Sequence, residues 1–547
     1  MRCSGRCPSR RKSMLLKSTL SLRPLRGAVM AVSLLALAPV AGAAPKLAPR
    51  ALAPKPTGRE LPARTFVERV VVKFHEGSHV RLRDDALRAL ASERDAAERE
   101  LLSGLRLEDA RVEADVAEVA ALLERAPRIG ALSRLFQGEE ASLDASKLSG
   151  EARSGQQLAD LNLYFEVPLL PGTTAENVAE LVEALNRVPS VEAAYAQPPA
   201  EPAMVNFGME EGLRTLLAAA DIAPTTPLYQ TNQGYLNAAP SGINATYAWT
   251  QTGGRGNNVK FVDIEGGWRT THEDFPTFFR VGGTQFNDLG WRNHGTAVMG
   301  EIIGANNGYG VTGIASAATP GVEAIGAQSA ASAITNAAAA VGAGGVVLVE
   351  LHAQGPADGT ACTCNAGQCN YIAMEYWQGE YDAVRNATAN GVIVIEAAGN
   401  GSANLDAAAY GGRFNPATRD SGAILVGAST ATTRKPMCWT NFGARVNVHA
   451  WGESVVTTGY GDRFGGAYGE DQYYTSTFSG TSSASPIVVG AAISAQGVAR
   501  ANGRLLTSVQ MRGLLRNNGT AQATDTRQIG PLPDLRKMLP KVISGSY

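Results

Sequence analysis

A serine-rich stretch, FSGTSSASP (478–486), carries hydroxyl groups that could act as nucleophiles. A serine hydroxyl is a weak nucleophile until a neighbouring base takes its proton, so the stretch is informative only if a base exists elsewhere. His294 stands at the start of a helical pattern, NHGTAVMGEIIG, and Asp263 ends an apolar strand-like run, VKFVD. An acid, a base and a serine are the groups that nucleophilic catalysis by serine requires. Taken singly, however, such a histidine is commonly a capping residue and such an aspartate a turn former.

Four apolar runs would form the elements that position these groups: VKFVD (259–263), GVVLVEL (345–351), VIVIEAA (392–398) and AILVGAS (423–429). Runs without polar alternation are typical of strands buried on both faces, which predicts an α/β fold with a parallel sheet covered by helices. Catalytic groups on such sheets lie at the C-terminal ends of the strands.

The N-terminal half carries no chemical motif. Strands are predicted at 69–74, 161–169 and 191–198, one or two helices within 84–125, and a capped helix at 174–189. This order predicts a small α+β domain. Pro-rich stretches flank it, so we divide the chain into a linker (44–65), the α+β domain (66–200), a hinge (201–235) and an α/β domain (236–547).

The first 43 residues are predicted to be a secretory signal peptide. A basic segment precedes an apolar run that begins at Ala28, is interrupted by Pro39 and ends in the small-x-small pattern Ala41-Gly42-Ala43. An N-terminal membrane anchor is the alternative. We expect a secreted, envelope or periplasmic protein without a membrane span in its mature chain. The net charge of −1 lacks the basic excess typical of nucleic-acid binding, so no such partner is expected.

Four cysteines follow the signal: Cys362, Cys364, Cys369 and Cys438. An even number in an exported chain predicts one or two disulfides, and four cysteines allow three pairings. A metal knuckle is the weaker alternative because the spacing is not C-x2-C and no histidine is nearby. Free thiols are a third interpretation.

Taken together, FVDIEGGWRTTHEDF, NHGTAVMGEIIG, AAGN and FSGTSSASP resemble the motifs of the subtilisin-like serine peptidases, the subtilase family, over roughly residues 240–500. The order acid, base, serine is that of subtilisin. The serine motif G-T-S-x-A-x-P is matched from Gly480 to Pro486, and H-G-T-x-V-x-G from His294 to Gly300. The resemblance implies a three-layer α/β fold and a serine endopeptidase with Asp263, His294 and Ser482 as its triad.

The resemblance also assigns supporting residues. Asn400 in AAGN matches the side-chain donor to the oxyanion, although a plain turn is the simpler interpretation. Substrate-binding positions fall on two strand ends: Glu350, Leu351, His352, Ala397, Ala398 and Gly399. Two departures are evident, because Glu265 stands where a small residue or glycine is usual and His352 replaces a glycine.

A structural calcium ion is a further implication. The loop ANNGYGVTGI (305–314) aligns with the family's strong calcium site, and the ligand positions are Asp274, Ala305, Asn307, Tyr309 and Val311. Oxygen ligands of this kind suit Ca²⁺. Asp274, however, lies two residues farther from the triad aspartate than is usual, and a solvated loop without a metal is the alternative.

The α+β domain resembles an enlarged subtilase propeptide of ferredoxin-like shape. We therefore expect a monomeric zymogen that cleaves itself between about residues 198 and 235, acts on proteins or peptides, and is inhibited by its own propeptide. A permanently attached interaction domain is the alternative for this region. For the whole chain, an inactive binding protein and an esterase are the competing hypotheses; the complete motif set favours the peptidase.

Overall fold

The computed structural model describes residues 47–204, apart from residue 53, and residues 226–547, apart from 363 and 466–468. The predicted signal peptide and most of the hinge lie outside these residues. The described residues belong to one compact unit. Among them, no helix is both long and apolar enough to cross a membrane.

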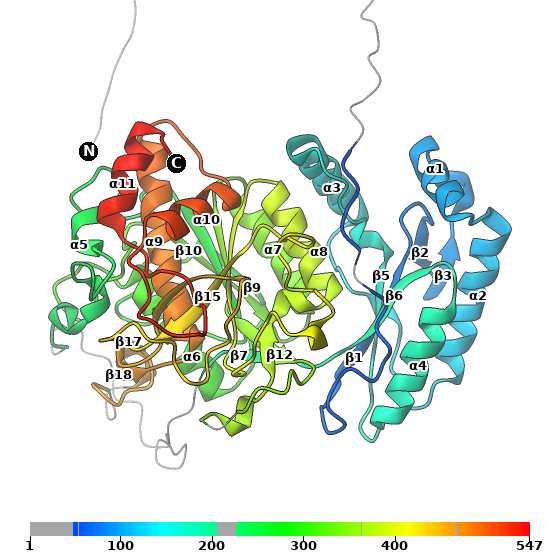
Figure 1. Ribbon diagram of the computed structural model, residues 1–547, viewed down its shortest axis with the longest axis horizontal. Helices are drawn as coiled ribbons and strands as arrows, with labels where there is room; N and C mark the ends of the chain where they lie inside the picture. Colours follow the sequence, from blue (N-terminus) through cyan, green and yellow to red (C-terminus); the bar gives the residue numbers. More distant parts are fainter. Residues whose placement is uncertain (1–46, 53, 205–225, 363, 466–468) are drawn as a thin grey trace, which may run out of the picture. The chain divides into compact units, whose positions relative to one another are not determined.

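A seven-stranded parallel sheet forms the centre of the C-terminal half (Figure 1). Its strands run in the order β16 (Val446–Trp451), β15 (Ile424–Ser429), β14 (Ile393–Ala397), β11 (Val346–Val349), β8 (Lys260–Glu265), β10 (Thr319–Ile325) and β9 (Arg280–Thr284). Every pairing between them is parallel. The four strands expected from the apolar runs are all present, which confirms the α/β prediction.

Helices cover both faces of this sheet because the strands are apolar on both. Helices α7 (Ala330–Val341) and α8 (Gln378–Ala389) pack with Val262 and Ile264 of β8. Helices α6 (Leu289–Ile303) and α9 (Thr481–Ala501) pack with Phe261 on the opposite face. The shorter helices α5 (Ala245–Ala248), α10 (Ser508–Asn517) and α11 (Leu535–Ser544) and the hairpin β17 (Val455–Thr458)–β18 (Tyr474–Phe478) complete this side.

Two element boundaries differ from the sequence prediction and matter for the site. Strand β8 runs two residues beyond Asp263 and ends at Glu265. Helix α6 begins at Leu289, capped by the Asp288 side chain, so His294 lies in its second turn rather than at its start. Both shifts change which side chains face one another.

In the N-terminal subdomain (66–200), the four strands of the main sheet and the two helices that pack on it follow the order β-α-β-β-α-β, the order of a ferredoxin-like fold. Its antiparallel sheet is β4 (Ser133–Arg134), β5 (Tyr164–Pro168), β1 (Arg69–Phe74) and β6 (Val191–Gln197), with α2 (Asp109–Arg125) and α4 (Ala175–Arg187) packed on one face. The sequence did not predict the hairpin β2 (Val80–Arg83)–β3 (Ala86–Ala89) or helix α3 (Glu140–Ser154); α1 spans Ala96–Leu105.

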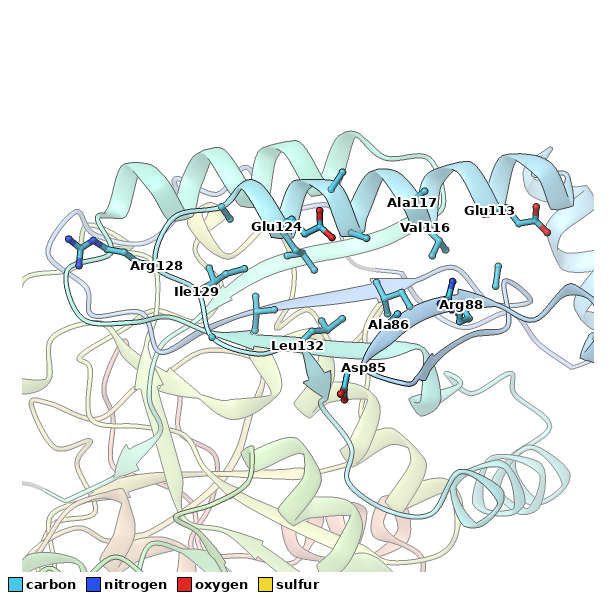
Figure 2. Close-up of a pocket in the computed structure, with 18 residues that line it drawn as sticks. Asp85, Ala86, Arg88, Glu113, Val116, Ala117, Glu124, Arg128, Ile129 and Leu132 are labelled. Carbon is cyan, nitrogen blue, oxygen red and sulfur yellow. The ribbon is translucent and has the colours of Figure 1, made fainter.

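A hollow of about 810 Å³ opens between α2, β3 and the chain that follows α2 (Figure 2). Val116, Ile129 and Leu132 point into it. All of its lining residues belong to the N-terminal subdomain, so this hollow takes no part in the chemistry described below.

A buried ion cluster ties the linker to the N-terminal subdomain. Arg50 is paired with Glu76, Glu192 and Asp382, and Lys73 Nζ lies 3.0 Å from Glu192 Oε2. The arginine of the predicted linker is therefore buried against the folded chain. Burial alone would raise the pKa of Glu192, but Lys73 and Arg50 lower it to about 2.

This cluster makes stability depend on pH. Because the folded pKa of Glu192 lies below its unfolded value, its contribution is fully present above about pH 4.5 and is lost as pH falls toward 2. We expect urea unfolding of the Ser482→Ala chain to show a free-energy loss of roughly 3 kcal/mol from this group over that window.

The variant Glu192→Gln should be less stable at pH 7 and should lose less on acidification. The exposed pair of Arg59 with Glu176 provides a matched control, and Glu176→Gln should change little. Equal acid sensitivity of the Glu192→Gln chain and its parent would contradict this account.

Candidate active site

The end of strand β8 places two carboxylates on one face of the sheet, because side chains two residues apart in a strand point the same way. Glu265 Oε2 lies 2.5 Å from His294 Nδ1. Asp263 Oδ2 instead accepts a hydrogen bond of 2.8 Å from Trp268 Nε1. The structure therefore puts Glu265, rather than Asp263, in the position expected of the acid beside the base, which corrects the assignment made from the sequence.

A signal in the sequence could have identified Glu265. Asp274 lies two residues too far from Asp263, and that offset disappears when Glu265 takes the acid's position. The error came from ending the strand at the first acidic residue, although parallel pairing with β10 continues through Glu265.

His294 is fully buried, and its ring packs edge-on against Phe478. Burial lowers the pKa of the imidazole to about 3, so the ring is neutral near pH 7. When Nδ1 carries the proton and donates it to Glu265, Nε2 is left with a free lone pair. In the described part of the chain, Nε2 has no hydrogen-bond partner. The ring is therefore arranged to act as a base through Nε2.

Ser482 lies in the first turn of α9, where backbone N–H groups are unpaired and favour negative charge. Its hydroxyl makes no hydrogen bond of normal geometry among the described residues, although it lies close enough to Glu350 to lower the pKa of that carboxyl. The neighbouring hydroxyls are engaged, because Ser483 Oγ donates to the Trp451 carbonyl at 2.9 Å and Ser485 Oγ to the Thr481 carbonyl at 2.8 Å. Of these three serines, Ser482 is the one with a free hydroxyl.

Asn400 lies three residues beyond Ala397, the last residue of β14, and its amide orientation is fixed. Its Oδ1 accepts hydrogen bonds from the Thr481 N–H (2.9 Å) and the Thr481 hydroxyl (2.8 Å). The Nδ2 group is therefore the remaining donor, and it is 3.3 Å from Gln368 Oε1. An amide held in this way beside a nucleophile can stabilise an oxyanion, an interaction typically worth about 2.7–4 kcal/mol.

Residues 201–204, which the sequence assigned to a hinge, lie against these groups. Strand β7 (Glu201–Pro202) pairs antiparallel with β12 (Leu351–Gln354), which also pairs with β13 (Tyr371–Ala373). The Ala203 carbonyl then accepts a hydrogen bond of 3.2 Å from the Ser482 N–H. Ala203 is fully buried. The chain's own segment thus occupies the place of an extended peptide at the serine.

The predicted substrate-binding residues do not all lie at the same place in the site. Leu351 and His352 lie in β12 opposite Pro202 and Glu201, respectively. Glu350 points into the interior, where Ser485 Oγ donates to its Oε2. Ala397 ends β14, whereas Ala398 and Gly399 are held by Asn441, which donates from Nδ2 to the Ala398 carbonyl.

The cysteine-rich insertion lies beside Asn400. Cys362 is bonded to Cys369, and Cys364 to Cys438. This loop carries Gln368, which sequence analysis missed and whose Nε2 is 3.4 Å from the Pro202 carbonyl. No local motif marks Gln368, because its position depends on the disulfides.

The residues of the predicted calcium site converge, but the side-chain oxygens of Asp274 and Asn307 are engaged in hydrogen bonds. Asp274 Oδ1 accepts from Asn307 Nδ2 at 2.9 Å, and Oδ2 from the Val311 N–H at 2.7 Å. The Ala305 N–H donates to the Asp274 carbonyl, and the Tyr309 N–H to Asn307 Oδ1. In this arrangement N–H donors face the carboxylate where a cation would need free oxygens, so the observed conformation does not fit a bound ion.

Comparison with known proteins identifies the family of this chain. The model of the Peptidase_S8 family, described as the subtilase family, matches residues 243–530. The chain belongs to the subtilase family. It is similar to subtilisin DY of Bacillus licheniformis, with 28% identity over 250 residues covering 44% of this chain and 77% of that protein. It is also similar to the major intracellular serine protease of Bacillus subtilis (strain 168), with 26% identity covering 48% and 77% of the two chains.

Among solved structures, this subtilase resembles fervidolysin from Fervidobacterium pennivorans, a keratinolytic enzyme related to subtilisin. The TM-score is 0.50 at 15% identity, covering 90% of this chain and 64% of that one. This likeness concerns the fold. The family and the named serine proteases establish a serine-type endopeptidase.

The contact between Glu265 and His294 can be tested by substitution. In Glu265→Gln the amide cannot hold the imidazole tautomer and its charged form as a carboxylate does, so we expect kcat for a peptide anilide to fall roughly 10³- to 10⁴-fold. Glu323→Gln, which alters another buried glutamate on the same sheet, should leave kcat nearly unchanged. A Glu265→Gln enzyme with wild-type kcat would show that this carboxylate does not serve the base.

Proposed function

We propose that this subtilase is made as a zymogen that cuts its own chain between Ala203 and Met204, with Glu265, His294 and Ser482 as its triad. One observation carries the proposal: the Ala203 carbonyl accepts from the Ser482 N–H at 3.2 Å while the preceding residues pair with β12. Extended peptides are commonly bound by such strand addition.

In the proposed reaction, Ser482 Oγ attacks the carbonyl carbon of residue 203 while His294 Nε2 takes the hydroxyl proton. The developing oxyanion is stabilised by the Ser482 N–H and Asn400 Nδ2. His294 then returns the proton to the nitrogen of Met204, the C–N bond breaks, and Ser482 carries an acyl group. Water, deprotonated by His294, hydrolyses that ester.

After the cut, residues 201–203 would remain paired with β12 as a bound product. Tyr371 Oη of the peptidase half donates to Glu201 Oε1 at 2.9 Å. The N-terminal subdomain is attached to that half through contacts such as Tyr195 Oη, which accepts from the Gly379 N–H at 2.9 Å. We propose that this subdomain is an inhibitory propeptide and that activity against other proteins appears when it is removed.

Export of this zymogen is part of the proposal. The N-terminal signal pattern supports it, and so do the two disulfides, because disulfides persist mainly in oxidising compartments. The expected products are an extracellular or envelope enzyme and a released propeptide.

Autoprocessing can be tested by comparing the wild-type chain with Ser482→Ala after purification in isolation. The wild type should yield a fragment whose N-terminus is Met204, read by intact mass and N-terminal sequencing, whereas Ser482→Ala should stay whole. Ala203→Asp should slow the cut at least about 100-fold, because a charge would enter a buried position.

Ala200→Asp, which lies just before the paired residues, is the control and should be processed normally. Processing of Ser482→Ala at the wild-type rate would refute self-cleavage. A first fragment that begins far from residue 204 would refute the assigned bond.

Calcium binding at the loop 305–311 also remains a proposal. It requires the Asn307 amide to turn so that Oδ1, rather than Nδ2, faces Asp274. The support is that the fully buried Asp274 and the four loop residues converge at one place.

Calorimetric titration of the chelator-treated Ser482→Ala chain with CaCl2 should give one saturable event and a higher Tm. Asp274→Asn should abolish both, while Asp462→Asn, an acidic change in another loop, should abolish neither. A chain that shows neither heat nor a Tm increase with calcium binds no ion here.

A further inference from the structure

Two carboxyl oxygens beside the base lack a partner in the described chain. Asp263 Oδ2 accepts a hydrogen bond from Trp268 Nε1, and Glu265 Oε2 is hydrogen-bonded to His294 Nδ1. The remaining oxygens, Asp263 Oδ1 and Glu265 Oε1, are buried and receive no donor from the protein. Buried polar atoms are normally hydrogen-bonded. Two unpartnered oxygens on side chains that point to the same face of β8 therefore require an explanation.

A single proton shared by the two carboxyl groups would explain why both oxygens lack another partner. Two adjacent ionised carboxylates repel each other strongly in a buried setting, whereas a pair that shares one proton has a single charge and an internal hydrogen bond. The two side chains also act on each other's pKa, as expected of neighbouring carboxyl groups on one face of a strand. The proton satisfies both orphan oxygens at once.

We infer that Asp263 is protonated in the working enzyme and donates this proton to Glu265, which makes Asp263 a positioning residue for the acid of the triad. The inference rests on the proposed catalytic use of Glu265. The contacts indicate which carboxyl group holds the proton. Glu265 faces an imidazole that becomes cationic during the reaction, so Glu265 is the group that should stay ionised. Asp263 Oδ2, in contrast, accepts from the neutral indole of Trp268, and among the described residues Asp263 acts on His294 only electrostatically, without a hydrogen bond.

The surroundings favour a proton on Asp263. Burial, followed by the neighbouring Glu265, raises its pKa well above the usual range, while Trp268 and His294 oppose the shift. Burial also raises the pKa of Glu265 well above the usual range, and the neighbouring Asp263 offsets only part of that shift. Glu350, which follows β11, and Tyr460 also act electrostatically with Glu265.

Glu350 adds to the crowding of acids. Its carboxyl interacts with both members of the pair and with Glu301 on α6, and burial raises the pKa values of Glu350 and Glu301 well above normal. With so many buried acids in one region, only a carboxylate with a specific donor is expected to stay ionised. Donation from Asp263 gives Glu265 that advantage and keeps it ionised to lower pH.

The test compares two replacements of Asp263 in the processed enzyme, with a p-nitroanilide of the chain's own Glu-Pro-Ala as substrate. In Asp263→Asn, Trp268 needs an acceptor, so the amide oxygen should face the indole and Nδ2 should donate to Glu265. This variant mimics the protonated acid. We expect its kcat within about threefold of wild type with an unchanged pH profile.

Asp263→Leu has a similar volume but no donor. Its kcat should fall roughly tenfold or more at pH 7, with KM within about twofold, because Glu265 loses a hydrogen bond. The pKa of Glu265 should rise without that donor, so the acid limb of the kcat profile should move up by about one pH unit.

The inference is overturned if Asp263→Asn loses as much activity as Asp263→Leu, or if Asp263→Leu behaves as wild type. A loss of about 10⁴-fold in Asp263→Asn would instead identify Asp263 as the ionised triad acid. A wild-type enzyme without peptidase activity would refute the proposed function itself, which separates the two failures.

A second measurement does not depend on activity or on the stability of the leucine variant. The infrared difference spectrum between Ser482→Ala and Ser482→Ala with Asp263→Asn should contain the carbonyl-stretch band of one protonated carboxylic acid. A difference spectrum that contains carboxylate bands instead would show that Asp263 is ionised and would overturn the inference.

Discussion

The buried contact between Glu265 and His294 is the interaction on which the site depends. It fixes which imidazole nitrogen carries the proton and, among the described residues, leaves Nε2 without a hydrogen-bond partner. The contact exists because β8 extends to Glu265 while α6 begins early enough to bring His294 over the strand end. A parallel sheet with helices on both faces makes both positions rigid, since each is enclosed by apolar side chains.

The second constraint is backbone pairing along β12. Because residues 201–202 add to that strand, the following carbonyl is delivered to the N–H of Ser482 without any specific side chain. The same pairing would serve any extended peptide, which is why the proposed zymogen would act first on its own chain and, after release, on others. The disulfide-bonded loop adds Gln368 at this place, beside the amide that would bind the oxyanion.

Sequence reasoning recovered what local patterns encode and missed what tertiary packing decides. The apolar runs located the strands, and the serine and histidine motifs located Ser482 and His294. The acid was assigned to Asp263 because an acidic residue was taken as the strand's end, yet hydrogen bonding to β10 carries the strand to Glu265. Residues 201–204 were assigned to a hinge because proline content cannot reveal a partner strand 150 residues away. Helix α3 has few buried residues and thus a weak periodic signal.

The most direct test of the central claim observes the Nδ1 proton of His294 by NMR in the Ser482→Ala chain. A proton donated to a buried carboxylate resonates far downfield. The account predicts that this resonance disappears in Glu265→Gln and persists, with a modest shift, in Asp263→Asn. Its loss in Asp263→Asn together with persistence in Glu265→Gln would show that the base is served by Asp263, and would contradict the account.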